Sequence, residues 1–126
     1  MKDREHEIQV ECVRWFRMRF RDEIIYAIPN GGQRNVVVAA KMKAEGVTAG
    51  VPDLFVAAMR GGYGGLYVEM KKSRVGKRGE LVDKGTLSDA QREMIPRLIK
   101  KGYKVAVCYC FDDFKDECER YFAIEN

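Results

Sequence analysis

Apolar side chains recur at three- and four-residue spacing in the first part of the chain. The stripe from Ile8 to Phe16 predicts an amphipathic helix over residues 3–21. The same spacing returns over residues 88–101, which open with the S-x-x-Q pattern of a helix capping box and are followed by Gly102. Two amphipathic helices therefore lie in well-separated parts of the chain.

Shorter apolar runs bounded by turn residues predict four strands, at residues 24–28, 53–59, 66–72 and 103–110. The two middle strands are joined by the glycine-rich residues 60–65, which predicts a hairpin.

The remaining segments complete the predicted order of elements. A helix is expected over residues 35–45, and Asp112 or Asp113 is expected to cap a last helix that runs to about residue 122. Residues 73–86 are polar, basic and glycine-rich, so we expect an exposed mobile loop there. The order of helices and strands predicts an α/β fold with a mixed β-sheet flanked by helices.

Composition restricts the class of protein. The chain has 126 residues, a length typical of one domain, and 46% apolar with 33% charged residues exclude a disordered or collagen-like chain. No apolar run reaches the length of a membrane span, and the charged opening residues are unlike a signal peptide. We expect a cytoplasmic protein whose cysteines are reduced core residues, namely Cys12, Cys108, Cys110 and Cys118.

Positive charge is concentrated in one block. The net charge is +4, but residues 71–104 hold eleven Lys or Arg against four Asp or Glu, whereas residues 105–126 hold two against six. A basic block within one folded domain is typical of proteins that bind a polyphosphate. On charge alone, a solvated basic surface is an equally good interpretation.

Candidate chemistry begins with carboxylates, because the single histidine, His6, argues against a His-based zinc site and a Ser-His-Asp triad. Asp53 opens one predicted strand, and Glu69 and Lys71 lie two residues apart on the next, so Glu69 and Lys71 face the same side. If the hairpin pairs these ends, two carboxylates converge beside a lysine. Oxygen ligands of this kind suit Mg²⁺ or Mn²⁺, which can activate a water and polarise a phosphate.

Three polar residues lie on apolar helix stripes. At about 100° per residue, Glu5 and Gln9 fall within the stripe of the first helix, and Gln91 falls within that of the helix at 88–101. Glu7 and Glu11 fall on the opposite face. A polar side chain aimed at the sheet needs a partner, which an active site supplies. The alternatives are fraying of the first turn for Glu5 and a plain capping box for Gln91.

The ordered motifs resemble those of the virus-type replication-repair nuclease (VRR-NUC) domain, a branch of the PD-(D/E)xK nuclease superfamily. The motifs are G-V-P-D-L at 50–54, L-Y-V-E-M-K at 66–71 and L-S-x-x-Q at 87–91, with an N-G-G loop at 30–32. The resemblance covers nearly the whole chain, as one domain over residues 1–126. It implies a restriction-endonuclease-like fold with an αβββαβ core. It also implies a phage- or bacterium-encoded protein of the host cytosol that acts as a homodimer on branched DNA. The basic segment 73–86 is longer than in minimal members.

Together, the residues and the resemblance predict a Mg²⁺- or Mn²⁺-dependent, structure-selective DNA endonuclease acting on Holliday junctions or flaps. Glu5, Asp53 and Glu69 are expected to hold the metal, Lys71 to be the catalytic base or charge stabiliser, and Gln91 to orient the site. Candidate DNA contacts, each with a solvated or turn-forming alternative, are Asn30, Arg34, Lys72, Arg74, Lys77 and Arg78. The competing interpretations are an exonuclease or restriction-like nuclease on the same residues, a non-catalytic DNA-binding module, and a small structural protein with a basic surface.

Overall fold

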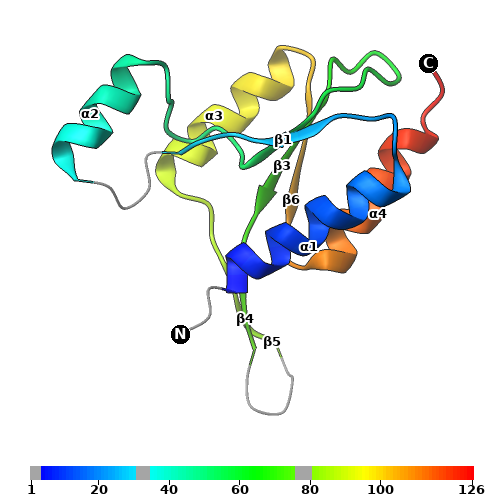
Figure 1. Ribbon diagram of the computed structural model, residues 1–126, viewed down its shortest axis with the longest axis horizontal. Helices are drawn as coiled ribbons and strands as arrows, with labels where there is room; N and C mark the ends of the chain where they lie inside the picture. The colour runs from blue at the N-terminus through cyan, green and yellow to red at the C-terminus, as the bar shows by residue number, and fades with distance from the viewer. Residues whose placement is uncertain (1–3, 31–34, 76–80) are drawn as a thin grey trace.

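The computed structural model describes residues 4–30, 35–75 and 81–126 (Figure 1). The helices in these ranges are α1 (Arg4–Arg19), α2 (Val36–Ala44), α3 (Asp89–Lys100) and α4 (Phe111–Ala123). The strands are β1 (Ile25–Ala27), β2 (Leu54–Val56), β3 (Leu66–Met70), β4 (Ser73–Val75), β5 (Leu81–Lys84) and β6 (Lys104–Cys108). No helix in these ranges has the length and apolarity needed to cross a membrane.

Four strands form one sheet in the order β1-β2-β3-β6. The pairs β1–β2 and β2–β3 are antiparallel, whereas β3 and β6 are parallel. The parallel pair is possible because α3 carries the chain back across the sheet between β3 and β6. The predicted mixed α/β sheet is therefore confirmed, and the predicted hairpin of β2 and β3 lies at its centre.

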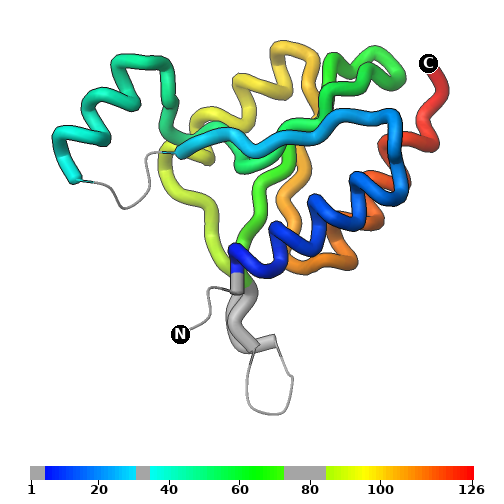
Figure 2. Tube along the Cα trace, in the orientation of Figure 1, coloured from blue at the N-terminus to red at the C-terminus, as the bar shows by residue number. Residues whose placement is uncertain are grey.

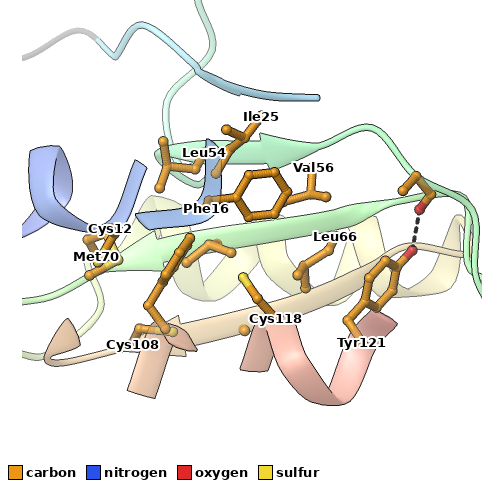
Figure 3. Packing of buried hydrophobic residues seen from close by; sticks show 14 residues of the cluster. Cys12, Phe16, Ile25, Leu54, Val56, Leu66, Met70, Cys108, Cys118 and Tyr121 are labelled. Atoms are coloured by element: carbon orange, nitrogen blue, oxygen red, sulfur yellow. Dashed lines mark hydrogen bonds between the residues drawn. The ribbon is translucent and has the colours of Figure 1, made fainter. Parts of the chain in front are cut away.

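The core lies between one face of this sheet and helices α1 and α4, which pack side by side (Figures 1 and 2). Strand alternation sends every second side chain to this face, where it meets the apolar stripe predicted for α1. Figure 3 shows this packing, with the Tyr121 hydroxyl donating a 2.6 Å hydrogen bond to the carbonyl of Ala58. The largest fully buried apolar side chains of this core are Phe16, Leu54, Val56, Leu66, Val68, Phe114 and Tyr121.

The opposite face of the sheet is covered unevenly. Helix α3 packs against β6, while aromatic rings on the other strands remain partly exposed. These rings form a continuous row from Tyr26 through Phe55 and Tyr67 to Tyr103, with centroids 4.6–5.7 Å apart between neighbours. Helix α2 stands away from the body and buries none of its residues (Figure 2).

Three local predictions are wrong. Within the expected loop at 73–86, β4 and β5 pair as an antiparallel ribbon, with Ser73 opposite Lys84. Cys110 is exposed, because β6 ends at Cys108 and Cys110 is the N-cap residue of α4. Neither Asp112 nor Asp113 is the N-cap residue of α4; Asp113 instead accepts a 2.8 Å hydrogen bond from the backbone amide of Tyr109.

Candidate active site

The register of β2 and β3 places two carboxylates side by side. Leu54 pairs with Val68, so Asp53 and Glu69 are the next pair at the end of this ladder. The Asp53 Oδ2 atom accepts a 2.9 Å hydrogen bond from the backbone amide of Met70. Asp53 is therefore held against β3, and the convergence predicted from strand alternation is present.

Glu69 is the buried charged residue of the described chain, with 3% of its surface exposed. Its Oε2 atom accepts a 2.8 Å hydrogen bond from Gln91 Nε2 and lies 3.6 Å from Lys71 Nζ. Its Oε1 atom is buried and has no hydrogen-bond partner among the described residues. A buried carboxylate oxygen without a donor is costly unless something else binds it.

Gln91 has two partners through the two ends of one side-chain amide. Its side-chain oxygen accepts a 2.8 Å hydrogen bond from the backbone amide of Ser88. The Ser88 hydroxyl in turn accepts a hydrogen bond from the backbone amide of Gln91, which completes a capping box. Its nitrogen donates to Glu69. The helix-cap interpretation of Gln91 is therefore confirmed, and the contact with Glu69 is compatible with its predicted role of orienting the site, which stays a prediction.

The first turn of α1 closes the same cavity. Glu5 Oε1 accepts a 3.1 Å hydrogen bond from the backbone amide of Lys72, just after β3. The cavity has a volume of about 380 Å³. It is lined by Glu5, His6, Gln9, Asn30, Asp53, Glu69, Met70, Lys71 and Gln91. All five predicted catalytic residues thus line one cavity. Glu7 and Glu11 are exposed, as the helical projection predicts, but Glu5 in the first turn of α1 is also exposed.

The electrostatics of the pair follow from burial. Loss of solvent is the main cause that raises the pKa of Glu69 to about 7, and the nearby charge of Asp53 raises it further. Burial also raises the pKa of Asp53, although hydrogen bonds from Met70 and Asn30 and the charge of Lys71 oppose the shift. The site therefore disfavours two adjacent negative charges until a cation offsets them.

A divalent metal fits this donor set. The unpartnered Glu69 Oε1 and the adjacent Asp53 carboxylate provide hard oxygen ligands in a polar cavity. Within the described ranges, no three His, Cys, Asp or Glu side chains are close enough to enclose a metal, so water or phosphate oxygens would complete its coordination. Glu5 lines the cavity, but its carboxylate bonds to Lys72, so its role as a ligand stays a prediction.

The candidate DNA contacts are placed only in part. Asn30 lines the cavity, and the exposed Lys72 lies at its rim, where its amide binds Glu5. Arg74 belongs to β4, in the short ribbon that continues from β3. Arg34, Lys77 and Arg78 lie outside the described residues. His6, which is not among the predicted site residues, is exposed and also lines the cavity, as its position one turn before Gln9 indicates.

Without metal, the protein is expected to lose stability as pH rises from about 4.5 to about 7. The folded state holds the Glu69 proton more tightly than the unfolded chain, so the stabilisation is complete below the ordinary pKa of 4.5 and is lost through about 7. Such a shift corresponds to about 3 kcal/mol. Thermal denaturation in EDTA at pH 5 and pH 8 measures it. Glu69→Gln should show a much smaller pH dependence, and equal dependence in both proteins would contradict the assignment.

Comparison with known proteins gives concordant matches. The model of the VRR-NUC domain family matches residues 2–112. A solved structure described as a VRR_NUC domain protein is 28% identical in sequence, has a TM-score of 0.75, and aligns over 100% of this chain and 93% of its own. No protein of curated function matches significantly. Both matches span every catalytic candidate, from Glu5 to Gln91.

Proposed function

The chain belongs to the VRR-NUC domain family, a family of PD-(D/E)xK nucleases, and on that basis we propose that it is a Mg²⁺- or Mn²⁺-dependent endonuclease that cleaves branched DNA. The observation that carries the proposal is the buried Glu69 carboxylate, which has one oxygen without a partner and lies beside Asp53. A buried carboxylate beside a second, partly buried one destabilises a folded protein unless a cation binds them.

The residues have distinct roles in the proposed reaction. When bound, the divalent ion supplies positive charge to the scissile phosphate and acidity to an attacking water. Asp53 and Glu69 present carboxylate oxygens to it, and the Gln91 amide fixes the orientation of Glu69. The Lys71 ammonium, 3.6 Å from Glu69 Oε2, is positioned to hold the water or to neutralise charge on the phosphate.

A panel of labelled DNA substrates tests the function. Four-way junctions, flaps, forks and linear duplex are incubated with Mg²⁺, Mn²⁺ or EDTA, and products are sized on denaturing gels. We expect internal cuts in branched substrates only when metal is present. Terminal trimming would identify an exonuclease, and cutting of linear duplex would identify a restriction-like enzyme. Binding without cleavage in any metal would identify a non-catalytic DNA-binding module.

The register of α1 provides a sharper test of the metal ligands. Glu5→Gln is expected to lower cleavage at least tenfold and to raise the Mg²⁺ concentration at half-maximal activity, because Glu5 lines the acidic cavity. Glu7→Gln is the matched control, since it removes the same charge from the same helix turn at a position that does not line the cavity. Equal effects of the two substitutions on the Mg²⁺ requirement would show that Glu5 serves no metal.

We further propose a homodimer, supported by the composition of α2. Seven of its nine residues are apolar and none is buried, with Val36 and Val37 85% and 71% exposed. An apolar helix is stable against water only when another surface covers it, and a second copy of the chain supplies one. Light scattering should give a dimer mass for the wild type and for Ile99→Glu on α3, but a lower mass for Val37→Glu. A monomeric wild type would refute the dimer.

A further inference from the structure

A groove lies outside the acidic cavity, between α1 and the edge strand β1. Its volume is about 600 Å³. It is lined by His6, Gln9, Val10, Val13, Arg14, Arg17, Met18, Tyr26 and Ala27. His6 and Gln9 also line the acidic cavity, so the two depressions adjoin at the first turns of α1. The groove therefore borders the cavity that Asp53 and Glu69 line.

The polar lining of the groove is cationic. Arg14 and Arg17 are one helical turn apart on the same face of α1, and the described lining contains no acidic residue. Arg17 Nη2 donates a 3.4 Å hydrogen bond to the carbonyl of Ile25, so its guanidinium is anchored at the outer edge of β1. That contact occupies an outward-facing carbonyl of the strand edge, which disfavours an added peptide strand there. The charge favours a polyanion instead.

The remaining lining suits flat apolar groups. Tyr26 is 48% exposed on the edge strand β1, where it borders both the groove and the aromatic row on the sheet face away from α1, with its ring 5.7 Å from the Phe55 ring. Val10 and Met18 are 39% and 68% exposed on the opposite wall of the groove. Bases stack on aromatic rings when they are unpaired, whereas a duplex hides the faces of its bases. Arginines with an exposed tyrosine and aliphatic walls thus fit a single strand better than a double helix.

We propose that this groove binds the unpaired strand of a branched DNA substrate, with its phosphates on Arg14 and Arg17 and a base stacked on Tyr26. The inference rests on the proposed function and adds to it a source of selectivity. A substrate with an unpaired arm gains contacts that a fully paired duplex lacks, and the arm leads its junction to the acidic cavity.

Binding measurements without metal test the inference independently of cleavage. Fluorescence anisotropy in EDTA compares a labelled duplex carrying a ten-nucleotide single-stranded arm with the same duplex without it. Tyr26→Ile, which keeps a β-branched apolar residue in the strand, should weaken binding of the armed substrate roughly fivefold or more. Tyr26→Phe should bind it like the wild type, because the ring is retained. Arg14→Ala should also weaken arm binding, whereas Arg97→Ala, an exposed arginine of α3, should not.

The outcomes separate this inference from the function on which it rests. Loss of affinity confined to the armed substrate supports the groove, even if no DNA is cleaved under any condition. Equal affinity of wild type, Tyr26→Ile and Arg14→Ala for that substrate overturns it, even if the protein cleaves branched DNA efficiently. An equal loss for armed and blunt duplexes also overturns it, because the groove would then contribute general affinity only.

Discussion

Asp53→Asn is expected to lower the rate of DNA cleavage by about 10³-fold or more while leaving DNA affinity unchanged or higher. Bound metal contributes several kcal/mol to phosphoryl chemistry, and each 1.36 kcal/mol is tenfold in rate. The fold should persist, because the asparagine amide oxygen can accept the 2.9 Å hydrogen bond that Met70 donates to Asp53. Affinity should not fall, because the substitution removes a negative charge that faces the phosphates. Single-turnover cleavage and equilibrium binding measure the two effects.

A second measurement on the same variant tests the electrostatic coupling of the pair. The charge of Asp53 helps to raise the pKa of Glu69 to about 7, so Asp53→Asn should lower that pKa. NMR titration of the Glu69 side chain without metal reports the change. If cleavage and binding instead disappear together with thermal stability, Asp53 has a structural role and the metal assignment fails.

Gly50→Ala is expected to destabilise the protein by several kcal/mol and to impair the active site in the molecules that remain folded. Gly50 has a φ of +87°, which an alanine adopts only with strain of roughly 1–2 kcal/mol. An added Cβ would also lie 2.6 Å from the carbonyl carbon of Ala90 and 3.1 Å from the amide nitrogen of Gln91. The first turn of α3 must then move, and Gln91 moves with it, away from Glu69.

Gly62→Ala is a matched control for this close approach. Gly62 has a nearly identical φ of +90°, but an added Cβ there would meet nothing within 4 Å among the described residues. The free energy of unfolding of this variant should therefore fall only by the cost of backbone strain, and each folded molecule should cleave DNA at the full rate. Urea denaturation and cleavage rates well below the melting temperature separate the contributions. Equal behaviour of the two variants would show that the packing of Gly50 on α3 does not position the site.

The parts of the fold that follow a simple period were predictable from sequence. Strand alternation placed Glu69 beside Lys71, and the hairpin brought Asp53 to the same end, because a two-residue period leaves few other registers. The helical period likewise placed Glu5 at the cavity and Glu7 away from it, although both side chains are exposed. These predictions concern the direction in which a side chain leaves its helix or strand. That direction is set by the local backbone geometry of each segment.

The features that were missed depend on contacts between segments. The ribbon of β4 and β5 is rich in polar residues and glycine, and only Val75, Leu81 and Val82 indicated strands within it. Cys110 continued an apolar run, but the parallel partner β3 ends its pairing at Met70, opposite Cys108, which leaves no ladder beyond. The groove beside β1 could not be predicted, because it depends on how far α1 lies from the edge of the sheet.

The two partners of Gln91 constrain which amino acid this position accepts. Glutamate would serve the capping box as well as glutamine, because the cap uses only an acceptor oxygen. It could not donate to Glu69 and would add a third negative charge to the cavity. We therefore expect related sequences that keep both Asp53 and Glu69 to have glutamine at this position. Glutamate is expected only where that acidic pair has been lost. A glutamate at this position would indicate a related protein that keeps the fold but has lost nuclease activity.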